Sequence, residues 1–186
     1  MLRQIKSKQE IEKKSKRNQL IVGSILIGLM ILSTAGYSFL DSGDSGADKK
    51  SEYRGLKFNL VNGLWQTEMQ GISFKFQYLP QDVENISVIG NFSMQNYINN
   101  VLYVVNNNQG FQDIYINLEQ YILRTQPACL NNSNCTEFPV KTCDENIIVF
   151  KESNETSVSQ DNKCILINGD GFRGADAYMY HLLGII

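Results

Sequence analysis

The feature that most constrains this chain is a segment of 23 residues without a charged side chain, residues 18–40, which read NQLIVGSILIGLMILSTAGYSFL. At about 1.5 Å per residue, a helix of this length is about 34 Å long, enough to cross a hydrocarbon core of about 30 Å. Asn18 and Gln19 suit the inner membrane interface, and Tyr37 and Phe39 suit the outer one. We therefore predict one transmembrane helix over residues 18–40.

The charges on either side of this segment predict its orientation. Residues 1–17 carry seven cations and two anions, a net charge of +5, and because the whole chain carries −2, residues 18–186 carry −7. Segments rich in Lys and Arg stay on the cytoplasmic side of a membrane. We expect a single-pass protein with a cytoplasmic basic arm, residues 1–17, and an extracytoplasmic remainder. Its first expected partner is the lipid bilayer, whose anionic headgroups the basic arm can also contact.

A cleaved signal peptide is the alternative to this signal-anchor. Ser33 and Ala35 are the small residues that a signal peptidase accepts on the two sides of Thr34, with cleavage after Ala35. The long basic arm and the apolar residues that follow Ala35 favour the uncleaved anchor. Cleavage would release a secreted protein, so the two outcomes differ in their consequence for function.

The segment after the anchor changes sharply in composition. Residues 41–50 read DSGDSGADKK, which contains no large apolar side chain and cannot contribute to a core. We predict a flexible linker over residues 41–52 and one extracytoplasmic domain over residues 53–186. That domain has a common size and enough aromatic residues for a single core.

The start of the domain predicts a three-stranded antiparallel meander. The segments 56–60 and 72–78 alternate polar and apolar residues, and Asn62-Gly63 is a strong type I′ turn signal because both positions need positive φ. Gln70-Gly71 is a second, weaker turn. With two-residue turns, nearly all the apolar side chains lie on one face, and a shift by one residue would destroy this agreement. We interpret Trp65 as a core residue on that face.

The rest of the domain predicts a β-α-β-β segment and a C-terminal helix, hence an α+β fold. The expected elements are a short helix at 81–86, strands at 101–105, 146–150 and 164–167, a helix at 111–125 ended by Pro127, and a helix carrying Ala175, Tyr178, Met179 and Leu182. The last two strands are expected to form a long polar hairpin. A mixed sheet with helices on one face accommodates these elements.

All four cysteines lie in the extracytoplasmic domain, at Cys129, Cys135, Cys143 and Cys164. An even number of cysteines in an exported domain favours two disulfides. Proximity in sequence favours Cys129–Cys135 with Cys143–Cys164, although three connectivities are possible. The spacings do not match a redox Cys-x-x-Cys motif or a zinc site, so no metal is predicted.

Two features have an alternative functional reading. Residues 169–174 read GDGFRG, a literal Gly-x-Gly-x-x-Gly between a predicted strand and a predicted helix, but too little chain follows for a dinucleotide fold. We predict a strand-to-helix turn, with a small anion at the helix start as the alternative. His181 is the only histidine, and we interpret it as a surface or packing residue rather than a general base.

Five Asn-x-Ser/Thr sequons mark candidate glycosylation positions in solvent-facing loops, Asn85, Asn91, Asn131, Asn134 and Asn154. The net charge of −7 outside the basic arm argues against nucleic acid as a partner. No catalytic residues and no cofactor are predicted.

The sequence favours a membrane-tethered extracytoplasmic interaction or accessory domain, without indicating its specific role. Another membrane or envelope protein is the expected macromolecular partner. One alternative is a membrane-anchored envelope hydrolase that uses a carboxylate pair or His181. Another is a small subunit of a membrane complex that the anchor helix contacts. A buried pair of ionisable groups in a pocket would favour the enzyme, whereas an open surface would favour binding.

Overall fold

The computed structural model describes residues 18–27, 29–30, 49–131 and 135–186. The chain divides into two compact units, Met1–Ala47 and Asp48–Ile186.

In the first unit, residues 18–27 and 29–30 are helical, and their apolar side chains are exposed, with Leu20 at 72%. Within the part of the chain that is described, no helix combines the length and the apolarity needed to span a membrane. The predicted span 18–40 also includes residue 28 and residues 31–40, which lie outside the described residues. The same is true of the basic arm, of residues 41–48 of the linker and of the position after Ala35. The transmembrane helix therefore stays a prediction.

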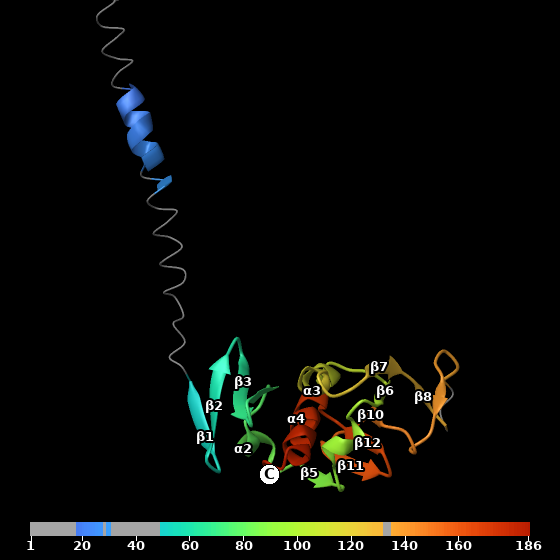
Figure 1. Cartoon of the computed structure of the whole chain (residues 1–186). Helices are drawn as coiled ribbons and strands as arrows, with labels where there is room; N and C mark the ends of the chain where they lie inside the picture. The colour runs from blue at the N-terminus through green and yellow to red at the C-terminus, as the bar shows by residue number, and fades with distance from the viewer. Residues whose placement is uncertain (1–17, 28, 31–48, 132–134) are drawn as a thin grey trace, which may run out of the picture. The chain divides into compact units, whose positions relative to one another are not determined.

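The second unit begins with a four-stranded antiparallel sheet in the order β1-β2-β3-β4 (Figure 1). Its strands are β1 (Lys50–Tyr53), β2 (Leu56–Val61), β3 (Leu64–Met69) and β4 (Ile72–Phe76). The last three strands are the predicted meander. Strand β1 is an addition to the prediction, because Lys50–Glu52 were expected to end the linker. These residues pair with β2 through a third tight turn at Arg54-Gly55.

The turn chemistry of the meander explains its register. Asn62-Gly63 and Gln70-Gly71 both have positive φ at the two turn positions, as type I′ turns require. Two-residue turns at these positions pair Leu60 with Trp65, Trp65 with Phe76 and Thr67 with Phe74, and the sheet has these pairs, so the predicted register is confirmed. One face of the sheet consequently carries the buried Phe58, Phe74 and Phe76, whereas the other carries exposed polar residues.

The second sheet has six strands in the order β5-β11-β12-β10-β6-β7. They are β5 (Ser87–Ile89), β6 (Val101–Val105), β7 (Arg124–Pro127), β10 (Ile147–Lys151), β11 (Ser157–Asp161) and β12 (Cys164–Asn168). Only β11 and β12 are antiparallel to each other, so four neighbouring strands, β12, β10, β6 and β7, are parallel.

The prediction that β10 and β12 form a hairpin is wrong. These strands are parallel neighbours, and the polar segment between them contains β11, which forms a hairpin with β12 through Asn162-Lys163. The sequence of β11, SVSQD, has one apolar residue, Val158, which is 1% exposed, so its strand signal is weak. Antiparallel pairing with the apolar β12 stabilises it as a strand.

Four helical segments complete the unit: α2 (Pro80–Val83), the 3₁₀ turn η2 (Met94–Asn96), α3 (Gly110–Leu118) and α4 (Gly171–Leu182). Helix α3 is shorter than the predicted 111–125, and Pro127 ends strand β7 instead of a helix. Two backbone hydrogen bonds end the helix: Asn99 N donates to Tyr121 O, and Leu123 N donates to Asn100 O. They direct the chain after α3 to the edge of β6, where it forms β7.

The two longer helices lie between the two sheets (Figure 1). One continuous core joins Phe58 and Phe76 of the four-stranded sheet, Tyr178 and Tyr180 of α4, and Ile167 of β12. Residues 174–180 of α4 are all buried, which is expected of a helix with a sheet on either side. The fold is therefore α+β, with a β-α-β layering of the domain.

The other face of the six-stranded sheet is covered by the cysteine-bearing segment. Strands β8 (Cys129–Leu130) and β9 (Val140–Lys141) form a small parallel pair there. A second apolar cluster, Val105, Ala128, Ile147, Val149 and Cys164, lies beneath it. The predicted disulfides Cys129–Cys135 and Cys143–Cys164 are both present, and the second one ties the covering segment to β12.

Candidate functional site

An open cleft of about 390 Å³ lies where three parallel strands of the large sheet end. Asn106–Asn108 follow β6, Lys151 and Glu152 stand at the end of β10, and Gly169 follows β12. Phe150 completes the lining, but this residue is only 3% exposed. The carboxyl ends of parallel strands are where open α/β sheets bind their ligands, and this volume falls in the ligand-site range of about 300–1,000 Å³.

Asn106 fixes the wall of the cleft between β6 and β10. Its backbone has φ 52°, in the left-handed region, where Asn is tolerated better than most residues. This turn places the Asn106 Nδ2 within 3.3 Å of the Phe150 carbonyl oxygen, to which it donates. The carboxamides of the neighbouring Asn107 and Asn108 are left on exposed residues beside the cleft.

The glycines of the GDGFRG segment have three different steric roles. Gly169 has φ 77°, and a Cβ there would lie 2.7 Å from the Glu155 carbonyl oxygen. A Cβ on Gly171 would lie 2.4–2.8 Å from atoms of the Asn108 carboxamide, and a Cβ on Gly174 would lie 2.5 Å from the Ile167 side chain. The first glycine thus permits the turn after β12, the second lets α4 approach the cleft wall, and the third packs α4 against the sheet.

Helices α3 and α4 begin side by side next to the cleft. A Cβ on Gly110, the first residue of α3, would lie 2.2 Å from the Gly171 carbonyl oxygen. Both helix starts already have intramolecular acceptors. Asn108 Oδ1 accepts from Gly110 N at 2.9 Å, and Asp170 Oδ1 accepts from Phe172 N at 3.0 Å and from Arg173 N at 3.2 Å. The Asp170 carboxylate thus occupies the position that the sequence reading considered for a small anion.

A pair of buried carboxyl groups lies elsewhere, where α3 and α4 meet the end of β4. Asp176 is 0% exposed and accepts from Gln77 N at 2.9 Å and Tyr78 N at 2.8 Å. Asp113 is 5% exposed. Burial raises the pKa of Asp113 to about 6 and the pKa of Asp176 well above its usual value, helped by the negative charge of Asp113. Each carboxyl has one buried oxygen without a partner among the described residues.

This pair does not form part of the cleft. Neither Asp113 nor Asp176 lines it, and their hydrogen bonds go to the backbone of residues 77 and 78 and, for Asp113, to the side chain of Gln77. They join the helices to the four-stranded sheet. Sequence reasoning missed them, because a single Asp inside an apolar helix pattern carries no signal of its partner.

His181 lies in the last turn of α4, away from the cleft lining. Partial burial lowers its pKa, and its ring centroid lies 6.4 Å from that of Phe92. Within the described part of the chain, no carboxyl or hydroxyl group is hydrogen-bonded to its side chain. This environment agrees with the interpretation of His181 as a packing residue.

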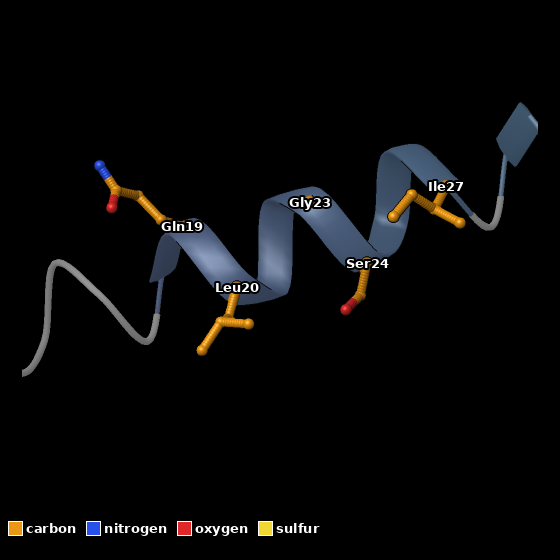
Figure 2. Close-up of a pocket in the computed structure, with 5 residues that line it drawn as sticks. All are labelled: Gln19, Leu20, Gly23, Ser24 and Ile27. Carbon is orange, nitrogen blue, oxygen red and sulfur yellow. The ribbon is translucent and has the colours of Figure 1, made fainter.

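The helix of the first unit has a shallow hollow along one face, lined by Gln19, Leu20, Gly23, Ser24 and Ile27 (Figure 2). It arises because Gly23 has no side chain and Ser24 has a short one. Small residues of this kind allow close helix contacts in a membrane. None of the five residues that line the hollow is ionisable.

The remaining candidate positions are accessible. Asn85, Asn91, Asn131 and Asn154 are exposed, as glycosylation requires, whereas Asn134 lies outside the described residues. Their glycosylation stays a prediction. Among the described residues, no group of three or more His, Cys, Asp or Glu side chains is arranged to hold a metal ion.

Comparisons with protein-family models, with curated proteins and with solved structures found no match for this chain.

Proposed function

We propose that this protein is a membrane-tethered extracytoplasmic binding domain, and that its binding site is the cleft at the ends of β6, β10 and β12. The observation that carries the proposal is the position of that cleft. Three parallel strands and two helix starts converge on it, and it is lined by exposed carboxamides and one pair of opposite charges. Such convergence of polar groups from separate elements is typical of a ligand site.

Three features support the extracytoplasmic, tethered part of the proposal. The uncharged segment 18–40 is long enough to span a bilayer, and the basic arm before it carries a net charge of +5. The two disulfides in the domain are typical of an oxidising compartment. On this reading the anchor keeps the domain near the membrane, where its partner is another membrane or envelope component.

The geometry favours binding over the hydrolase alternative. A hydrolase needs ionisable groups that converge where a substrate can reach them. Here the carboxyl pair, Asp113 and Asp176, is sealed between helices and sheet, and His181 packs beside Phe92. The cleft itself offers Lys151 and Glu152, which suit recognition by charge and hydrogen bonding.

Site-specific photo-crosslinking tests this function. A photoreactive residue at Asn107, in the full-length protein in membranes of the source cells, is expected to give a defined adduct after irradiation. The matched control is the same residue at Lys57, which is exposed on the polar face of the four-stranded sheet. The proposal fails if position 107 gives no adduct, or if both positions give the same set of adducts.

A further inference from the structure

We infer that the ligand of the cleft is neutral and rich in hydroxyl groups, that is, a carbohydrate. This inference rests on the proposed function and concerns the chemistry of the same site. The polar side chains of the cleft can hydrogen-bond hydroxyl groups, and its lining disfavours apolar and anionic ligands.

Apolar ligands are disfavoured by the lining. Phe150 is the one apolar residue among the lining residues, and because it is only 3% exposed it offers little apolar surface to a ligand. The remaining lining residues are three Asn, one Lys, one Glu and one Gly. A ligand without hydrogen-bonding groups would leave these polar side chains desolvated and unpaired.

Anionic ligands are disfavoured by the charges and by the helix starts. The N–H groups at the start of α4 already donate to the Asp170 carboxylate, and Gly110 N of α3 donates to Asn108. The cation of the glycine segment is directed elsewhere: Arg173 donates to the Asp82 carbonyl oxygen, and its guanidinium lies over the Tyr78 ring, 5.3 Å from the centroid. Within the lining, the cation Lys151 is accompanied by the anion Glu152, so the charged side chains of the cleft carry no net positive charge.

The carboxamides match hydroxyl groups. The exposed Asn107 side chain both donates and accepts, as each sugar hydroxyl does, whereas Asn108, whose Oδ1 accepts from Gly110 N, offers its amide N–H groups, so the two residues together can bond adjacent hydroxyls. The carboxylate of Glu152 adds an acceptor and the ammonium of Lys151 adds donors. The cleft is open to solvent on the exposed side of these residues, which permits a sugar at the end or within a longer glycan to enter.

Calorimetric titration of the full-length protein tests the ligand class, in a detergent without a sugar headgroup. The neutral probes are maltotriose and chitotriose, the acidic sugar is trigalacturonic acid, and the simple anion is pyrophosphate. We expect a neutral trisaccharide to bind with a Kd no weaker than about 1 mM. We expect no measurable binding of the acidic sugar or of pyrophosphate.

Three variants and one surface control locate the binding and test whether anions are excluded for the stated reason. Asn107→Ala removes an exposed carboxamide, and Gly171→Ala displaces the Asn108 carboxamide by placing a Cβ against it, so each should weaken saccharide binding at least about tenfold. Lys57→Ala is the matched surface control and should leave the binding unchanged. Asp170→Ala frees the N–H groups of Phe172 and Arg173 and should create pyrophosphate binding that the unmodified protein lacks. Thermal unfolding of each variant verifies that it is folded.

The outcomes separate the ligand class from the site. Preference for trigalacturonic acid or pyrophosphate, or failure of both neutral probes to bind, overturns the carbohydrate inference. Saccharide binding that Asn107→Ala and Gly171→Ala both leave unchanged also overturns it. A specific adduct at position 107 together with any of these results leaves the binding function standing and rejects only the carbohydrate.

Discussion

At the residue scale, the buried carboxyl groups are polar contacts that join the helices to the four-stranded sheet. Asp176 accepts from the backbone where β4 ends, and Asn117 of α3 both donates to Lys75 O at 2.7 Å and accepts from Lys75 N at 2.8 Å. These side chains provide hydrogen bonds that a fifth strand would otherwise make. They satisfy one edge of the sheet and block its pairing with another chain.

The raised pKa of Asp113 predicts a pH dependence of stability. Its pKa is about 6 in the folded protein, against 3.8 as the ordinary value. Below about pH 4 the group is protonated in both states, whereas between about pH 4 and pH 6 the unfolded chain loses the proton first. The free energy of unfolding should therefore fall as pH rises through this window, a trend measurable by urea denaturation.

Asp113→Asn removes the charge that causes this dependence. The variant should gain about 1–2 kcal/mol in unfolding free energy near neutral pH and show a shallower decline between pH 4 and pH 6, because the raised pKa of Asp176 still contributes to that decline. Glu119→Gln is the matched control, because Glu119 is an exposed carboxylate just after the same helix. A variant as pH-dependent as the unmodified protein would contradict the assignment to Asp113.

Among substitutions of polar residues in α3, Asn117→Ala should be one of the most destabilising. Asn117 is 1% exposed, and its loss leaves the Lys75 N–H and carbonyl groups without their partner. An expected cost of about 2–4 kcal/mol follows from two unpaired backbone groups. Gln112→Ala, on the exposed side of the helix, should cost far less in the same denaturation experiment.

At the element scale, the two disulfides hold residues 128–131 and 135–146 over the outer face of the six-stranded sheet. The Cys143–Cys164 bond spans a sequence separation of 21, against 6 for Cys129–Cys135. Because the entropic stabilisation grows with loop length, we expect losses of about 3 and about 2 kcal/mol respectively when each pair is replaced by alanine. Hydrogen exchange should accelerate over residues 128–146 more strongly without Cys143–Cys164. Equal acceleration in both variants would show that the longer link does not hold the segment.

The elements that could be predicted from the sequence are those whose local chemistry agrees with their tertiary contacts. The meander was predictable because two Asn-Gly-like turns and one apolar face specify the same register. Strand β11 was not predictable, because its sequence, SVSQD, has a weak strand signal and forms a strand through pairing with β12. Helix α3 ends early for a similar reason: the contacts of Tyr121 and Leu123 with residues 99 and 100 outweigh an apolar stripe that continues to Ile122.

The candidate site was only partly visible in the sequence. The glycine segment 169–174 stands out as a motif, and Asn106–Asn108 read as a strand terminator. Their juxtaposition depends on the parallel order of β6, β10 and β12, which the hairpin prediction did not contain. The capping of α4 by Asp170 also required the structure, because an Asp before a helix is equally compatible with a free anion site.

At the scale of the whole molecule, topology is the open prediction. In intact cells, a membrane-impermeant maleimide should label a cysteine introduced by Lys57→Cys, which lies on an exposed face of the domain. A cysteine introduced by Lys8→Cys in the basic arm should be labelled only after lysis, because we expect that arm in the cytoplasm. The reverse pattern would overturn the orientation. Recovery of the labelled domain in the medium would instead indicate cleavage near Ala35.

The central position of α4 has a consequence for how this chain is made. Synthesis runs from the N-terminus, so both sheets emerge before residues 171–182 that lie between them. Until then, Phe58 and Phe76 on one side and Ile167 on the other have apolar faces without their common cover. The nascent domain must therefore remain open until its last helix arrives, and it depends on its surroundings for protection from aggregation during that interval.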